Sequence, residues 1–176
     1  MPSYDQYTTK ALDRHPDNEN FLQPTSFRFV LSRTPEVVYF CQNVSVPTIS
    51  VNATDILNQF PTTAIADPKM QFEPLSFSFL INEDLGNWKE IFDWMKSFSI
   101  NSEKYNPDIQ TDPRNYQTDG TLVILNSNAR PQASVTFKNM FPISLGDIEF
   151  NSADTGIDPQ SATVTFRYDT YDVTVY

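Results

Sequence analysis

Strict alternation of apolar and polar side chains at the C-terminal end constrains the fold of this chain more than any other feature. The segment 161–176 reads SATVTFRYDTYDVTVY, in which Val164, Phe166 and Tyr168 share one face of an extended chain. The intervening Thr and Arg side chains share the other face. Because successive side chains of a β-strand point to opposite faces, this period of two predicts one long, half-buried strand.

A second alternating segment lies near the start of the chain. Residues Ser26–Arg33 place their large apolar side chains on one face, Thr34–Pro35 is typical of a turn, and Glu36–Val46 then returns. These two segments predict a first antiparallel hairpin. The apolar residues expected in the core are Phe27, Phe29, Leu31, Val38, Phe40 and Val44.

Further strands are expected in the second half of the chain. Leu75–Ile81, which reads LSFSFLI, alternates most cleanly and is expected in the centre of a sheet. Thr121–Leu125 and Ala133–Phe137 are expected to pair with each other. Within Pro131–Phe150, the pair Phe141–Pro142 predicts a turn followed by a short strand.

One amphipathic helix is expected between these strands. In NEDLGNWKEIFDWMKSF an apolar stripe recurs at helical spacing, and Asn87 followed by Glu90 fits an N-cap. Trp94 lies off the stripe, and we expect it to pack under the loop that follows rather than at a subunit contact. The stripe consists of Trp88, Ile91, Phe92, Met95 and Phe98 or Ser99.

Three segments lack a clear period. Residues 1–22 are polar and predict a flexible N-terminal arm, which leaves 23–176 as one β domain. Residues 47–74 contain prolines that should interrupt any long regular element, and they predict an extended excursion. Residues 100–120 predict a long surface loop. The expected fold class is mainly β, an antiparallel two-sheet sandwich or squashed barrel with one α-helix.

The charge balance argues against a nucleic-acid-binding surface. The formal net charge is −10, and the chain lacks the clustered Lys and Arg that neutralise phosphates. Cys41 is the single cysteine, which excludes an intrachain disulfide, and we expect it to be a small core residue. With neither a signal-like start nor an apolar run of about 18 residues, a cytoplasmic, non-membrane protein is expected.

Residues able to carry chemistry are few and scattered. His15 is the only histidine and lies in the arm, so neither an acid–base group nor a zinc site is expected. The four glycines are too far apart for a phosphate loop. We therefore expect no enzyme, no catalytic, metal or cofactor-binding residue and no cofactor. The carboxylate pairs that we considered and interpret as turn or surface residues are Glu83–Asp84, Asp147 with Glu149, and Asp154 with Asp158.

Together, the two early strands, the helix and the strands after it resemble the tail tube proteins of contractile-tailed bacteriophages. The resemblance covers residues 20 to 176 and depends on element order. It implies a structural virion protein that self-assembles into stacked hexameric rings, whose lumen conducts phage DNA into the host without binding it. It also implies a projecting hairpin within residues 47–74 that contacts neighbouring subunits and the next ring.

The resemblance further implies other tail proteins as partners, namely the sheath, the baseplate tube initiator and the tail terminator, with the tape measure protein passing through the lumen. Assembly would take place in the host bacterial cytoplasm. The strands expected to line the lumen lie within 36–51, 133–150 and 162–175. The long segments 60–74 and 100–120 leave open a baseplate tube initiator of the same fold, and a tube of a bacterial contractile injection system is a further variant.

Two other classes remain open from the residues alone. One is a β-sandwich carbohydrate-binding module, and the other is a hydrolase with paired carboxylates. The aromatic residues that such a binding module would use are Tyr105, Tyr116, Phe141 and the two tryptophans.

Overall fold

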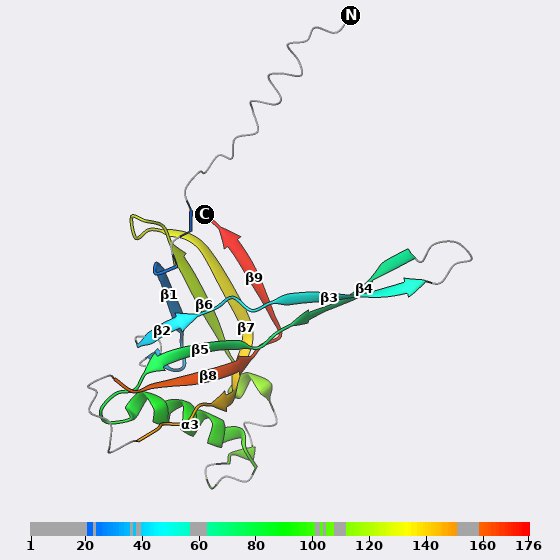
Figure 1. Ribbon diagram of the computed structural model, residues 1–176. Helices are drawn as coiled ribbons and strands as arrows, with labels where there is room; N and C mark the ends of the chain where they lie inside the picture. Colours follow the sequence, from blue (N-terminus) through cyan, green and yellow to red (C-terminus); the bar gives the residue numbers. More distant parts are fainter. Residues whose placement is uncertain are drawn as a thin grey trace, which may run out of the picture.

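Two antiparallel sheets, one long helix and a projecting hairpin make up the computed structural model (Figure 1). It describes residues 21–150 and 159–176, with gaps at 23, 36, 38–39, 57–62, 101–102, 104 and 108–111. Most of the predicted arm, residues 1–22, lies outside these ranges, as does Val38. The predicted class, mainly β with two packed antiparallel sheets, is confirmed, and one long α-helix lies within the described ranges.

Sheet A has four strands, each paired antiparallel with its neighbours. They are β1 (Phe27–Leu31), β6 (Thr118–Leu125), the first part of β7 (Pro131–Leu145) and β9 (Thr170–Val175). The predicted pairing of 121–125 with 133–137 is confirmed, since Ile124 lies opposite Ala133 and Thr121 opposite Thr136. The turn between them is closed by the Asn126 side chain, whose oxygen accepts the amides of Asn128 and Arg130.

Sheet B continues from the second half of β7. Its order is β7–β8–β5–β2, with β8 at Ser161–Arg167, β5 at Leu75–Leu80 and β2 at Cys41–Val44. Because β5 pairs with both β8 and β2, its predicted position inside a sheet is confirmed. Because β7 runs through both sheets, the two sheets share one strand.

The core lies between the inner faces of the two sheets. Phe29 of sheet A meets Phe77 of sheet B with ring centroids 5.0 Å apart, and Phe77 stacks on Phe166 at 5.5 Å. The alternation predicted for Phe29, Phe77 and Phe166 is confirmed, since each is at most 1% exposed. Burying such side chains is the main stabilising term of a domain this size.

The helix α3 (Gly86–Phe98) packs on the inner face of sheet B, because its Trp94 lies against Phe166, which stacks on Phe77 on that face. Trp94 is its deepest aromatic residue: it is 3% exposed, lies 5.8 Å from Phe166, and donates its indole N–H to the Tyr116 carbonyl at 2.7 Å. The predicted contact of Trp94 with the segment that follows the helix is confirmed through Tyr116, but its predicted position off the buried stripe is wrong, because Trp94 belongs to the core. Asn87 is not the N-cap, because that position is Leu85, in the left-handed region at φ 57. Buried Asn87 instead accepts the amides of Asn82 and Trp88.

Three sequence-based predictions about strands are wrong. β1 pairs with β6, and β2 pairs with β5, so no first hairpin forms between them. β7 continues through Phe141–Pro142 without a turn, because Pro142 pairs with Phe166 beside a β-bulge that absorbs the irregularity. The long terminal strand is divided at Tyr168–Asp169, which lets β8 pair in sheet B and β9 in sheet A.

The described parts of residues 47–74 form two regular strands, contrary to the prediction that prolines interrupt them. β3 (Ile49–Ile56) and β4 (Thr63–Phe72) pair as a separate hairpin that leaves the body on one side (Figure 1). Pro68 is tolerated inside β4 because a two-stranded ribbon consists of edge strands, and the pairing is already irregular between Val51 and Ala53. A projecting hairpin is what the resemblance implied for this region.

Candidate functional site

The outer face of sheet B is a polar surface almost free of charge. Ser76 and Ser78 lie opposite Thr165 and Thr163, and the hydroxyls of Ser76 and Thr165 are 3.0 Å apart. At the strand positions of this face, all within the described residues, no Asp or Glu occurs, and the charged residue is Arg167. In a chain with a net charge of −10, this face is a local exception.

The outer face of sheet A differs because it carries charges of both signs. Lys138 and Asp172 form an ion pair at 2.7 Å across β7 and β9, and the hydrogen bond to Asp172 raises the pKa of the Lys138 ammonium. Arg28 is exposed on β1. Of the two outer faces, only that of sheet B is a nearly uncharged Ser and Thr surface.

Sheet B ends in two edges at the described strands. One edge is β2, which pairs only with β5, and the other is the end of β7, residues 141–145, which pairs only with β8. Unpaired edges expose backbone N–H and C=O groups that a strand of another chain can bind. The four strands of sheet B are therefore open to extension on both sides.

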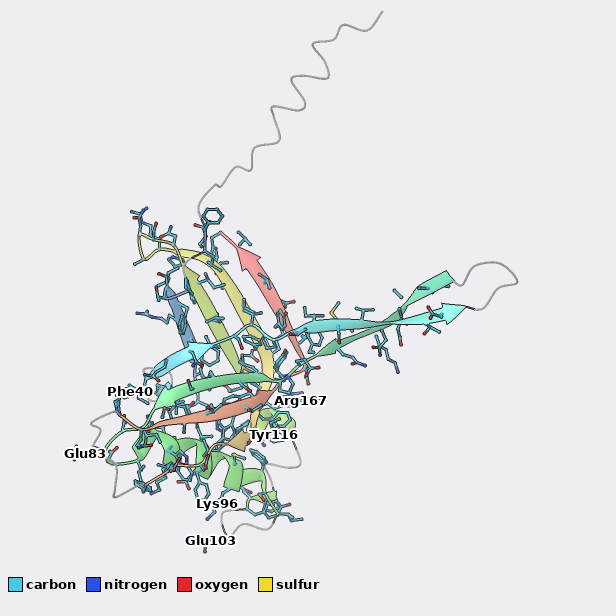
Figure 2. All side chains as sticks on the ribbon, viewed as in Figure 1. Phe40, Glu83, Lys96, Glu103, Tyr116 and Arg167 are labelled. Carbon is cyan, nitrogen blue, oxygen red and sulfur yellow. The ribbon has the colours of Figure 1, made fainter. Side chains whose placement is uncertain are left out.

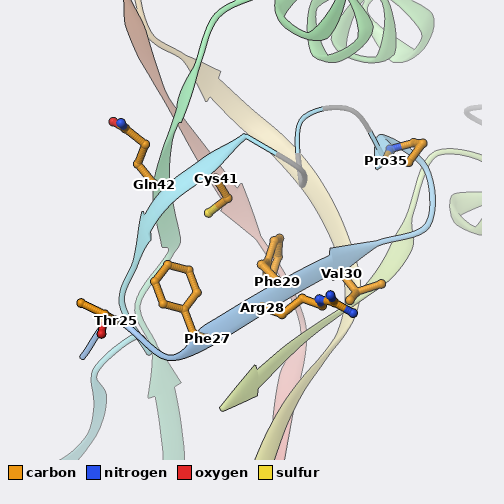
Figure 3. Close-up of a pocket in the computed structure, with 8 residues that line it drawn as sticks. All are labelled: Thr25, Phe27, Arg28, Phe29, Val30, Pro35, Cys41 and Gln42. Carbon is orange, nitrogen blue, oxygen red and sulfur yellow. The ribbon is translucent and has the colours of Figure 1, made fainter. Parts of the chain in front are cut away.

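A groove with a mixed polar and apolar lining lies beside the first of these edges, where β1 and β2 diverge. It has a volume of about 580 Å³, and Figure 3 shows Phe27, Phe29 and Cys41 turned towards one another in it. We call it the β1–β2 groove. Cys41 was expected in the core but is only partly covered. Its partial burial still disfavours the thiolate and raises the pKa of the thiol to about 11. The residues that line the groove are Thr25, Phe27, Arg28, Phe29, Val30, Pro35, Cys41 and Gln42.

An apolar surface lies beside the opposite edge of sheet B. Trp88 and Phe92 of α3 stack with ring centroids 5.2 Å apart, and the Trp88 indole donates to the Gly146 carbonyl just beyond β7. Phe92 is 37% exposed, and a hollow of about 420 Å³ lies between it and Leu145. We call this surface the α3 flank, formed by Trp88, Phe92, Met95, Lys96, Phe98, Ser99 and Leu145.

The β3–β4 hairpin carries a further exposed apolar surface. Ile49, Val51 and Met70 share one face near its base and are 43%, 48% and 55% exposed. Figure 2 shows the side chains of the hairpin standing clear of the body. At the base, Phe72 lies 5.6 Å from Tyr171, and Tyr171 donates its hydroxyl hydrogen to the Pro47 carbonyl at 3.1 Å. The hairpin is therefore anchored at one end.

The residues considered for chemistry are not brought together. His15, Asp154 and Asp158 lie outside the described residues. Asp84 accepts the Gly86 amide in a local turn. No group of three His, Cys, Asp or Glu in the described ranges could hold a metal ion. Within those ranges, no helix has the length and apolar character of a membrane span.

The aromatic residues considered for carbohydrate binding are mostly engaged within the protein. Tyr116 lies 5.8 Å from Phe141 and 5.4 Å from Phe98, and Trp94 is buried. Sequence reasoning missed the β1–β2 groove, because it assigned β1 and β2 to one hairpin. It assigned Trp88 and Phe92 to a buried stripe, whereas these residues form a partly exposed flank.

Comparisons with known proteins agree on the kind of protein to which this architecture belongs. A model of the family described as phage tail tube protein matches residues 5–174. A tail tube terminator protein of Enterobacteria phage T4 is 26% identical over 162 residues, which span 87% of this chain and 90% of that protein.

Solved structures share the fold. The tube-terminating cap of the anti-feeding prophage superposes with a TM-score of 0.68 at 13% identity, covering 93% of this chain and 97% of that one. The sheath–tube complex of the extracellular contractile injection system PVC, in its extended state, gives a TM-score of 0.65 at 17% identity, with 100% of both chains covered.

Proposed function

Because this chain belongs to the phage tail tube protein family, we propose that it forms a ring that terminates the tube of a contractile phage tail. Membership makes it a structural component of the virion tail. The observation that carries the terminator role is the relative from phage T4, a tail tube terminator that aligns over 90% of its length. The ring would have six subunits, as the resemblance implies, and would be assembled in the host bacterial cytoplasm.

The channel of this ring would be lined by the outer face of sheet B. Ser76, Ser78, Thr163 and Thr165 present hydroxyl groups there, with Arg167 at one end. Gripping DNA requires cations that displace counterions from phosphates, and this face has almost none. DNA and the tape measure protein would therefore pass without specific binding. This role is structural and requires no catalytic group.

Ring formation would also use the edges of sheet B. Joining β2 of one copy to the end of β7 in the next would continue the sheet from subunit to subunit, and a closed ring leaves no free edge. A further exposed apolar surface, on the β3–β4 hairpin, would contact an adjacent ring or another tail protein, such as the sheath or its terminator.

A second candidate is the repeating tube subunit, which stacks as many rings of itself. The match to the PVC sheath–tube complex, which covers both chains completely, favours it. The baseplate tube initiator stays an alternative prediction from the sequence. Neither the carbohydrate-binding module nor the hydrolase gains support from the family.

Electron microscopy of the purified protein over a concentration series, with mass measurement, separates the two leading roles. A terminator is expected to give single or paired rings that do not grow with concentration and that cap tubes of its own phage. A repeating subunit gives tubes that lengthen with concentration. A protein that stays monomeric at every concentration and does not bind tube ends would contradict both roles.

A further inference from the structure

A groove of mixed polarity and an apolar surface lie at opposite edges of the same sheet. The β1–β2 groove adjoins the β2 edge of sheet B, and the α3 flank adjoins the β7 edge. Figure 1 shows α3 below β8, with β2 on the other side of β5. Within one chain the two surfaces therefore cannot cover each other.

From this placement we infer that the α3 flank of one copy fills the β1–β2 groove of the next copy around the ring. The inference rests on the proposed ring and names the side-chain interface that would hold its subunits together. It assigns Phe92 and Trp88 as the inserted residues and the partly covered Phe27 and Cys41 as those that receive them, with Phe29 forming the floor of the groove.

Both surfaces lie on the same side of sheet B, which is the first argument for this contact. Cys41 pairs with Phe79, and Leu145 with Val164, so both belong to the inner face, where Phe79 and Val164 are fully buried. If β2 of one copy pairs with the end of β7 in another, the two inner faces become continuous. The groove and the flank then meet on that side, away from the polar outer face.

The composition of the two surfaces is the second argument. The groove has a volume of about 580 Å³, and its lining combines the apolar side chains of Phe27, Val30 and Cys41 with the polar side chains of Thr25, Arg28 and Gln42. The flank offers a stacked Trp88–Phe92 pair, and aromatic residues are enriched at the centre of protein interfaces. The apolar flank and the apolar part of the groove each gain from burial against the other, and the polar side chains of the groove can face the rim of the contact.

Their different shapes are the third argument. The groove and the flank are not copies of one another, so their contact is heterologous, and a heterologous contact that closes gives a ring. A two-fold dimer would instead bring identical surfaces together. The geometry is therefore that of cyclic assembly, with one groove and one flank used by each subunit.

Cys41 provides a reporter that needs no mutation. As the single cysteine of the chain, it lies in the groove, so its reaction with a maleimide measures whether the groove is filled. In assembled wild-type protein the thiol is expected to react at least tenfold more slowly than in the monomer. The total thiol is measured after denaturation.

Phe92→Ser tests the flank, and Lys89→Ser on the same helix is its matched control, since Lys89 is exposed and does not line the flank. Phe92→Ser is expected to raise the dissociation constant of the ring at least tenfold, because it removes an anchor residue of the interface. Cys41 should then react with maleimide as fast as it does in the monomer. Lys89→Ser should assemble as wild type does. Circular dichroism of the monomers checks that both variants are folded.

Crosslinking then tests the contact directly. Phe92→Cys, treated with a short bismaleimide, is expected to link to native Cys41 of the next copy and give a ladder that ends at the ring number. Lys89→Cys gives no ladder, and neither does Phe92→Cys in a Cys41→Ala background.

Four results would overturn the inference. If Cys41 reacts as fast in rings as in the monomer, the proposed ring stands but its β1–β2 groove is open. Rings without the Phe92→Cys ladder show that other surfaces hold them. Cys41 exposed by Val51→Asp but not by Phe92→Ser would assign the groove to the hairpin. A protein that never assembles removes the proposed ring and this contact together.

Discussion

The body and the β3–β4 hairpin of this protein use the same kind of strand for opposite purposes. In the body, Phe77 and Phe79 of β5 are at most 1% exposed and lie among aromatic side chains of both sheets. In the hairpin, Val51 and Met70 are about half exposed, with no second layer over them. Because a two-stranded hairpin is marginal alone in water, its apolar face indicates a surface made for contact with another chain.

Removing an aromatic ring from the body should have the largest effect. Phe77→Ala deletes a ring that contacts Phe29, Phe79 and Phe166, and we expect a loss of about 3–5 kcal/mol in the free energy of unfolding. Guanidinium unfolding of the monomer measures it. A loss below about 1 kcal/mol would contradict the assignment of the core to this position.

The junction between the two regions should respond less strongly. Tyr168 is 6% exposed, donates its hydroxyl hydrogen to the Glu73 carbonyl at 2.7 Å, and lies 6.1 Å from Phe72 at the hairpin base. Tyr168→Phe should cost about 1 kcal/mol at neutral pH, the net value of one hydrogen bond. It should also increase hydrogen exchange in β3 and β4, whereas unchanged exchange there would show that the anchor lies elsewhere.

The same residue predicts an alkaline loss of stability. Burial is the main cause that raises the pKa of Tyr168 to about 12, with Tyr171 and Glu73 adding to it. Tyrosine in the unfolded chain ionises near pH 10, whereas Tyr168 in the folded protein ionises only near pH 12. The stability that the neutral Tyr168 side chain contributes is therefore complete below about pH 10 and is lost as the pH rises from about 10 to about 12. Unfolding measured from pH 8 to 11.5 should show a shallower decline in Tyr168→Phe than in wild type. Parallel curves would contradict the role of Tyr168.

The smallest effect is expected in the hairpin itself. Val51→Ser should change the stability of the monomer by less than about 0.5 kcal/mol, because the side chain is 48% exposed and leaves no cavity. Unfolding under the conditions used for Phe77→Ala gives a direct comparison. A loss as large as that of Phe77→Ala would show that the hairpin folds as part of the body.

The local alternation of apolar and polar residues predicted where strands lie better than it predicted which strands pair with each other. The alternation around Phe29, Phe77 and Phe166 identified β1, β5 and β8 and their buried faces. The partner of β1 is β6, nearly a hundred residues later in the chain, and no local signal specifies such a pairing. Proline at 142 was taken for a turn because its fixed φ and missing donor are common in turns, yet an edge position beside a bulge accepts it.

The helix shows a second limit of local pattern. Its apolar stripe was recognised, but Trp88 and Phe92 lie on a partly exposed flank, whereas Asn87 and Trp94 are buried. Helical spacing identifies an apolar face and cannot tell whether the same chain covers it. The candidate surfaces therefore became visible only where apolar residues of the fold stayed uncovered.

The shared strand β7 has a mechanical consequence. Its first part is hydrogen-bonded to β6 and β9 and its second part to β8, so the sheets cannot separate unless this strand bends sharply or loses its hydrogen bonds to one of them. Force applied to one sheet is transmitted along this strand to the other, and the two should yield as a single cooperative unit. A subunit built in this way resists being pulled apart layer by layer when a tail contracts around it.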